Sequence, residues 1–259
     1  MKIKKIRRTK KSLIFAHRGA NREAAENTSH AFEKALEYPI DGIETDVQLT
    51  RDEVPVLWHD RFLDRLGMPS KHIDDFEYAK LKNFDFTGNF LIYSDNGNNR
   101  ESIMTLRAFL DAYRNDCRLL IEIKNREWEP PCRHEIKVRK TLEMVSPPVE
   151  DSIIVSSFDL DSLITAHQLE QDVPLIYNFE ADQTIEDARE VLSAYSYLYG
   201  LCFPIATINE SMVNLLHNDD KYVAVYTCNS EDEISKALEL KVDIIISDVP
   251  QKALQLRGG

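Results

Sequence analysis

The sequence predicts a (β/α)8 TIM barrel, and three observations support this fold class. Short β-branched and apolar runs alternate with helical patterns from one end of the chain to the other. Eight of these runs have the composition of strands, and the length of 259 residues is close to the ~250 typical of such barrels. An open, doubly wound α/β sheet is the alternative fold. We expect the barrel domain to cover residues 12–259.

The individual elements follow from hydrophobic periodicity. The expected strands are short runs rich in Ile, Val, Leu, Phe and Tyr, at residues 13–16, 42–47, 119–123, 152–156, 174–177, 199–203, 222–226 and 243–247. The expected helices have apolar residues at three- and four-residue spacing, at residues 29–37, 106–114, 135–145, 160–171, 185–194, 210–217 and 231–240. Because strand and helix alternate in this way, the strands are expected to be parallel.

Residues 61–102 interrupt this alternation. The segment has no clear strand-helix unit, yet it holds five of the eleven phenylalanines, at positions 62, 76, 84, 86 and 90. Aromatic side chains in a long irregular segment are expected to pack, and long loops in compact domains usually have a function. The sequence therefore predicts an inserted lobe after the second strand, beside the barrel mouth. The polar run 94–100 is expected to form its exposed tip.

Composition and charge exclude several classes of protein. The chain is 43% hydrophobic, and no apolar run approaches the ~18 residues that cross a bilayer, so we expect a globular protein without membrane insertion. Seven basic residues lie in the N-terminal arm, residues 1–11, and the rest has 25 basic against 44 acidic residues. Such an acidic body repels nucleic acid. The arm is expected to be solvated, with contact to anionic lipid or nucleic acid as the alternative.

Short motifs narrow the expected location and cofactor chemistry. The apolar run after the basic start covers only residues 13–16, which is too short for a secretory signal, so we expect a cytoplasmic protein. The four cysteines form no CxxC pair, which favours reduced thiols and argues against zinc. There is also no GxGxxG or GxxxxGK[ST] motif, so dinucleotide and P-loop phosphate sites are not expected.

Acidic side chains occur where predicted strands end. Active sites of these barrels gather at the carboxyl ends of the strands. Glu44 and Asp46 share one side of the second strand, and Glu122 lies on the third. These carboxylates would repel one another unless a cation neutralised them, and hard oxygen ligands suit Mg²⁺ or Ca²⁺. In the alternative, Glu44 and Asp46 pair with Arg18 or Lys124 and bind no metal.

Two histidines also follow strand ends. His17 ends the first strand, and His59 follows the short apolar run 55–58. Imidazole titrates near neutral pH, so this pair is the natural choice for a general acid and a general base. The five other histidines lie in or near expected helices or in the insertion, and we expect them to be structural: His30, His72, His134, His167 and His217.

A series of motifs, in order and spacing, carries a family resemblance. They are His17-Arg18-Gly19, Glu26-Asn27-Thr28, Ile43-Glu44-Thr45-Asp46-Val47, Leu49-Thr50-Arg51-Asp52, Val54-Pro55-Val56, His59-Asp60, Leu63-Asp64-Arg65, Ile121-Glu122-Ile123-Lys124, Ser157-Phe158-Asp159, Tyr226-Thr227-Cys228-Asn229 and Ile246-Ser247-Asp248-Val249-Pro250. From Ile14 onward the chain closely resembles the glycerophosphodiester phosphodiesterases. That family's (β/α)8 barrel, with a small insertion after the second strand, agrees with the fold expected from periodicity.

The resemblance implies roles for individual residues. His17 and His59 would be the catalytic pair, with His17 as base and His59 as acid. The divalent ion, Mg²⁺ or Ca²⁺, would be held by Glu44, Asp46 and Glu122. Arg18 and Lys124 would face the phosphate, although a salt bridge from Lys124 that closes the acidic cluster is the alternative. Glu26 and Asn27 would brace the loop that follows His17.

The implied reaction is metal-dependent hydrolysis of a glycerophosphodiester to sn-glycerol 3-phosphate and an alcohol. Attack by water and attack by the substrate's own glycerol hydroxyl, through a cyclic phosphate, are both compatible with these residues. Leu66-Gly67-Met68-Pro69-Ser70 and Tyr226 depart from the family pattern, which puts the alcohol-side specificity in doubt. The expected partner is a small-molecule substrate, and a homo-oligomer is compatible with the sequence.

Two other functions stay open on the sequence. A lysophospholipase D or sphingomyelinase D-like enzyme would share the barrel and both histidines but act on a lipid, and an exposed apolar groove in the insertion would favour it. A catalytically silent barrel that only binds ligands would lack a site residue, and none is missing here. An enolase-like enzyme would need carboxylates on later strands, and strands four to six have none.

Overall fold

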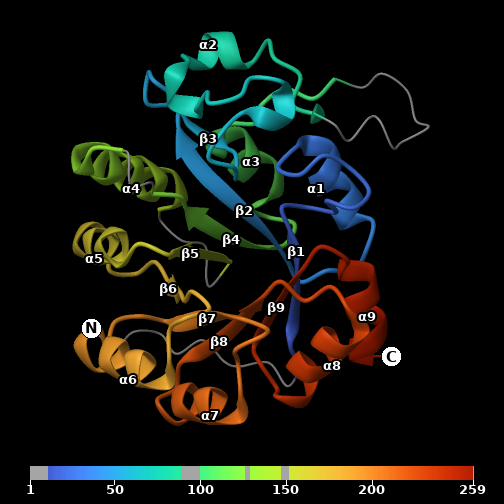
Figure 1. Cartoon of the computed structure of the whole chain (residues 1–259), viewed down its shortest axis with the longest axis vertical. Coiled ribbons are helices and arrows are strands. Elements are labelled where there is room, and N and C mark those ends of the chain that lie inside the picture. Colours follow the sequence, from blue (N-terminus) through green and yellow to red (C-terminus); the bar gives the residue numbers. More distant parts are fainter. Residues whose placement is uncertain (1–10, 89–99, 126–128, 147–151, 259) are drawn as a thin grey trace.

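The computed structural model describes residues 11–88, 100–125, 129–146 and 152–258, and these form a closed barrel of parallel strands with helices around it (Figure 1). The barrel strands are hydrogen-bonded to one another in chain order, and β1 pairs with both β2 and β9 to close the ring. This confirms the predicted (β/α)8 fold. The barrel strands are β1 (Leu13–His17), β2 (Gly42–Leu49), β4 (Arg118–Ile123), β5 (Ile153–Ser157), β6 (Leu175–Asn178), β7 (Gly200–Pro204), β8 (Tyr222–Tyr226) and β9 (Ile244–Ser247).

A short strand, β3 (Pro55–Leu57), extends the wall beside β2. β1 pairs with β2 only over Gly42–Glu44, whereas β3 pairs antiparallel with residues Val47–Leu49. β2 is eight residues long and extends beyond the end of β1, so β1 does not pair with the last residues of β2 at the mouth of the barrel. β3 covers the edge of these residues and carries the chain directly to His59.

A helix follows each barrel strand, and most begin at a polar residue whose side chain accepts a hydrogen bond from the first turn. These caps are Thr28, Thr105, Asp159, Thr184, Asn209 and Ser230. The helices are α1 (Ser29–Leu36), α3 (Leu106–Tyr113), α4 (Pro131–Val145), α5 (Leu160–Leu169), α6 (Ile185–Ala194), α7 (Glu210–Asn218), α8 (Glu231–Glu239) and α9 (Pro250–Gly258).

Two helices differ from the expectation. α4 begins at Pro131, four residues before the predicted start, because proline at the first helical position loses no intrahelical hydrogen bond. α9 was not predicted, since it buries only Pro250 and Ala253 and its sequence has little amphipathic character. None of the helices in the described segments has both the length and the apolarity needed to span a bilayer.

Side chains alternate between two layers of the core. Leu13 and Phe15 belong to a cluster made of strand residues inside the barrel, whereas Ile14 packs with the surrounding helices. Gly42 makes room for Phe15, because a Cβ atom at that position would lie 2.6 Å from the phenylalanine ring. His17 and Glu44 lie two positions further along β1 and β2, so their side chains also face inward, toward the carboxyl ends of the strands.

The described part of the segment 61–102 folds around its own apolar cluster at one end of the molecule (Figure 1). It contains η1 (Asp64–Leu66), η2 (Ile73–Asp75) and α2 (Tyr78–Leu81). The cluster comprises Val56, Trp58, Leu63, Ile73, Leu81, Phe86 and Ile103. Phe90, residues 94–99 of the expected tip and residues 1–10 of the basic arm lie outside the described residues.

Candidate active site

The predicted site residues meet at the carboxyl ends of β1, β2 and β4. Pairing between the strands aligns His17 with Glu44, and Asp46 with Glu122. A cavity of about 180 Å³ opens there, and six of the seven predicted residues line it: His17, Arg18, Glu44, His59, Glu122 and Lys124. The seventh, Asp46, is fully buried and contacts both Arg18 and Lys124.

Three carboxylates form a compact group. One carboxylate oxygen from each of Glu44, Asp46 and Glu122 lies within 4.8 Å of the other two, and the three side chains are buried. Burial raises the pKa of Glu44 well above its usual value, and the charge of Asp46 adds to the rise. The pKa of Asp46 lies well below its usual value although burial acts against this, because Lys124 and Arg18 stabilise its charge.

Two cations partly neutralise this group. Arg18 Nε lies 3.2 Å from Asp46 Oδ2, and Lys124 Nζ lies 3.1 Å from Asp46 Oδ1 and 2.5 Å from Glu122 Oε1. Burial lowers the pKa of Lys124, but Asp46 and Glu122 together hold it above its ordinary value. The salt bridge from Lys124 to the acidic cluster, which the sequence offers as the alternative to a contact with phosphate, is therefore present.

The donor set suits a hard divalent ion. Three carboxylates against two cations leave one negative charge in excess at the bottom of the cavity. Within the described segments, Asp46 Oδ1 and Glu122 Oε1 accept no well-aligned hydrogen bond, and the ammonium of Lys124 is their ion-pair partner. Clustered carboxylate oxygens with open positions are the ligands that Mg²⁺ and Ca²⁺ take, so these residues fit such an ion.

Asn27 holds Asp46 in place. Its Nδ2 donates to Asp46 Oδ2 at 3.0 Å, and its Oδ1 accepts from the Thr45 hydroxyl at 2.7 Å. Its backbone N–H also donates to the carbonyl of Arg18 at 3.1 Å. Asparagine tolerates the left-handed conformation found here, with φ of 57°. Asn27 therefore contacts the loop after His17, and it also orients a carboxylate of the acidic group.

His17 is held by a residue that the sequence analysis assigned no role. Its Nδ1 lies 2.6 Å from Asp248 Oδ1, and its Nε2 is 3.8 Å from Glu44 Oε2, on the cavity side. Asp248 also accepts hydrogen bonds from Asn21, Arg22 and Asn229. Burial lowers the pKa of His17, an effect that its hydrogen bond to the Asp248 carboxylate opposes. The pKa of Asp248 is lowered despite its burial, chiefly by the bond to His17.

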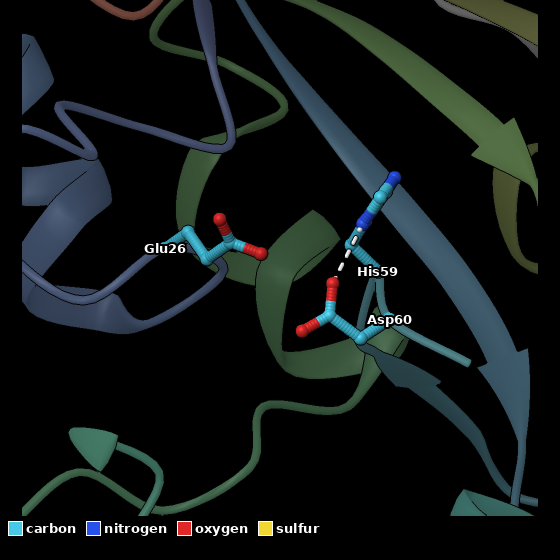
Figure 2. A group of neighbouring side chains, drawn as sticks. All are labelled: Glu26, His59 and Asp60. Carbon is cyan, nitrogen blue, oxygen red and sulfur yellow. Dashed lines mark hydrogen bonds and ion pairs between the residues drawn. The ribbon is translucent and has the colours of Figure 1, made fainter. Parts of the chain in front are cut away.

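His59 lies at the rim of the cavity, where its side chain is 31% exposed against 15% for His17. Its Nδ1 is 3.0 Å from Asp60 Oδ1, and Glu26 faces this pair from the loop after β1 (Figure 2). Arg65 bridges the two carboxylates, with Nε 2.7 Å from Asp60 Oδ2 and Nη2 2.7 Å from Glu26 Oε1.

This outer group does not resemble a second metal site. Ligand atoms of Glu26, His59 and Asp60 lie within 4.8 Å of one another, but the guanidinium of Arg65 already neutralises both carboxylates. Glu26 is also ion-paired with Arg18 at 3.2 Å. Arg65 of the lobe is therefore linked to His59 through Asp60, and to Arg18 through Glu26.

Comparisons with known proteins agree on one family. The model of the glycerophosphoryl diester phosphodiesterase family matches residues 17–252. A glycerophosphodiester phosphodiesterase of Bacillus altitudinis is 32% identical over 245 residues, covering 94% of this chain and 97% of that protein. An Oleispira antarctica phosphodiesterase, solved with the product sn-glycerol-3-phosphate, is 26% identical with a TM-score of 0.82, covering 95% of this chain and 96% of the other. A glycerophosphodiester phosphodiesterase of Thermotoga maritima is 25% identical with a TM-score of 0.73, covering 95% and 98%.

Proposed function

The chain belongs to the glycerophosphoryl diester phosphodiesterase family, and on that premise we propose that it hydrolyses glycerophosphodiesters to sn-glycerol 3-phosphate and an alcohol. The observation that carries the proposal is the cavity in which two histidines and two cations surround a buried group of carboxylates. The solved Oleispira antarctica relative, which binds sn-glycerol-3-phosphate, supports the same product for this chain.

We assign the carboxylates of Glu44, Asp46 and Glu122 to a divalent ion, Mg²⁺ or Ca²⁺, which when bound would supply Lewis-acid stabilisation of phosphate charge. Asn27 would keep Asp46 oriented toward this position through its 3.0 Å hydrogen bond. Lys124 and Arg18 contact the carboxylates and line the cavity. They would therefore also stabilise the negative charge of a phosphate bound beside them.

His17 is assigned as the general base. Its Nδ1 is occupied by Asp248, which holds the proton of the neutral ring on that nitrogen and leaves Nε2 as an acceptor toward the cavity. Nε2 can then take a proton from the attacking oxygen, which is either water or the glycerol hydroxyl of the substrate.

His59 is assigned as the general acid. Its greater exposure at the rim of the cavity supports a position beside the leaving alcohol, and the Asp60 carboxylate holds its ring through Nδ1. Its Nε2 would deliver the proton to the leaving alkoxide. Asp60 is itself held by Arg65, so a residue of the lobe positions the acid.

The described residues do not favour a lipid substrate. In those parts of the chain, Leu169 is the one large apolar side chain that is exposed, and it lies at the end of α5 rather than at the cavity. Most of the lobe's aromatic residues that the structure describes pack into its own cluster instead of lining a groove.

The test is an assay of the purified protein after chelation, with Mg²⁺ or Ca²⁺ restored. Glycerophosphodiesters and lysophospholipids would be compared by the alcohol that each releases, and sn-glycerol 3-phosphate from the glycerophosphodiesters would also be measured with a coupled dehydrogenase. We expect release from glycerophosphodiesters only when a divalent ion is present. Hydrolysis of the lysophospholipids alone, or full activity in excess chelator, would contradict the proposal.

A further inference from the structure

A second cavity adjoins the first at the mouth of the barrel. It has a volume of about 500 Å³ and shares His59, Glu122, Lys124 and Phe158 with the first cavity. Its own polar lining comes from three neighbouring strands and from the start of the lobe. Asn125, Asp159 and Glu180 follow β4, β5 and β6, respectively, each two residues beyond the last residue of its strand. Arg61, two residues after His59, contributes from the start of the lobe.

The position of His59 assigns this cavity to the leaving alcohol. A general acid must lie within hydrogen-bonding reach of the oxygen that it protonates. His59 lines both cavities, whereas His17 lines only the first. The phosphate is therefore expected in the first cavity, beside both histidines, and the group attached to the leaving oxygen in the second. This step rests on the function proposed above.

The polar groups of the second cavity are mostly hydrogen-bond acceptors. Asp159 and Glu180 are acidic and Arg61 is basic, so the residues that belong to this cavity alone carry one net negative charge. Asn125 donates through Nδ2 to Asp159 Oδ2 at 2.8 Å, and its Oδ1 is buried with no donor among the described residues. Asn125 therefore holds the Asp159 carboxylate in the wall of the cavity.

Glu180 has the freest of these carboxylates. Asp159 is engaged in capping α5, where it accepts from the backbone and hydroxyl of Ser162. The backbone of Glu180 is fixed by Gln183, whose side chain accepts its N–H at 2.7 Å, but its carboxylate is exposed and pairs with no cation within the described residues. The lining of the cavity thus presents the negative charge of Glu180, on a backbone that Gln183 fixes, to a group that enters.

We propose that the second cavity binds the alcohol of the substrate, that it selects alcohols carrying an ammonium group, and that Glu180 is the residue that determines this selection. An ammonium group supplies the positive charge and the N–H donors that the exposed carboxylate of Glu180 can accept. A neutral polyol such as glycerol fits the same volume but forms no ion pair with Glu180.

The experiment compares kcat/KM for glycerophosphoethanolamine and glycerophosphoglycerol, with the same divalent ion and at low ionic strength. The wild type is expected to prefer glycerophosphoethanolamine. Glu180→Gln should lower kcat/KM for that substrate roughly threefold to tenfold, because one partly exposed ion pair is lost, and should leave the value for glycerophosphoglycerol unchanged. Glu190→Gln, which removes an exposed carboxylate on α6 away from the cavity, is the matched control and should change neither value.

The outcomes separate this inference from the proposed function. Equal kcat/KM values for the two substrates in the wild type, or an equal loss on both in Glu180→Gln, would overturn the alcohol selection while leaving the phosphodiesterase function intact. Failure to hydrolyse either substrate would overturn the proposed function and this inference with it. Raising the salt concentration should reduce the preference of the wild type, since screening weakens an exposed ion pair.

Discussion

Nδ1 of His17 lies 2.6 Å from Oδ1 of Asp248, so a contact across 231 positions of sequence orients the proposed base. It exists because the barrel closes. β1 pairs with β9 in a register that aligns Ala16 with Ser247, so the residues that follow these two positions emerge side by side at the mouth. Asn21 and Asn229 then hold the Asp248 carboxylate from the loops after β1 and β8.

Asp248→Asn should lower kcat by roughly 100-fold or more while changing KM little, because the ring of His17 loses the acceptor that fixes its tautomer. Steady-state kinetics on a glycerophosphodiester and a thermal melt of the same sample would check this. Arg22→Ala removes a more exposed partner of Asp248 without touching His17, so it serves as the control. A loss confined to KM, or wild-type kinetics in Asp248→Asn, would show that the contact does not orient a catalytic group.

Removing one carboxylate of the acidic group should abolish stabilisation by a divalent ion. Adding Mg²⁺ or Ca²⁺ to chelator-treated protein is expected to raise the melting temperature, by an amount that corresponds to about 2.7 kcal/mol when the ion is at 100 times its Kd. Glu44→Gln should show little or no such shift, whereas the exposed Glu190→Gln should shift like the wild type. Equal shifts in all three proteins would place the ion elsewhere.

The sequence predicts this site well where strand geometry alone decides it. Side chains alternate along a strand, so Glu44 and Asp46 face one side of β2, and the pairing of β4 with β2 in the barrel sets Glu122 beside Asp46 at the mouth. The role of Asp248 was missed because it depends on the register between the first and last strands, which local periodicity does not encode. A closed barrel does make those strands neighbours, so the Ser247-Asp248 pair at the last strand's end was the available signal.

Ion pairing inside the cavity was harder to predict for a different reason. Arg18 and Lys124 reach Asp46 through side chains with several rotatable bonds, and the sequence does not specify which conformer is adopted. The sequence likewise shows β3 only as a short apolar run, since these three residues form a strand only because β2 extends beyond β1 and offers an edge for pairing. The missing information is tertiary in both cases.

Gly42→Ala should destabilise the barrel by about 1–3 kcal/mol, because the added methyl group overpacks the interior against Phe15. Its Cβ would lie 2.6 Å from the ring, which is buried on all sides. Urea unfolding of Gly42→Ala, Phe15→Leu and the double variant would measure the coupling. The double variant is expected to lose less free energy of unfolding than the two single variants together. Strict additivity would mean that the ring is not what excludes a side chain at position 42.

Glu233 should make the stability of α8 depend on pH. The backbone N–H groups of Ser230 and Asn229 lower the pKa of Glu233, so its charge stabilises the folded state above the unfolded pKa, and this contribution is lost as the pH falls through the lowered folded pKa. Glu233→Gln is expected to reduce the free energy of unfolding at pH 7 by about 0.3–1 kcal/mol, with a difference that shrinks in acid. A difference that stayed constant down to pH 2 would rule out a role for the charge.

The two histidines should respond differently to the quality of the leaving group. A nitrophenol oxygen needs little protonation, so His59→Ala should lose far less activity on a nitrophenyl phosphodiester than on a substrate with an aliphatic alcohol, where loss of a general acid costs roughly 10²–10⁴-fold. His17→Ala should lose activity on both substrates alike, since the attacking oxygen must still be deprotonated. The contacts agree with this division, because His17 is fixed by Asp248 beside the carboxylates while His59 lies at the rim of the cavity assigned to the alcohol. Equal losses by both variants on both substrates would show that the assignment of base and acid is wrong. Wild-type rates in both variants would show that the histidines have structural roles.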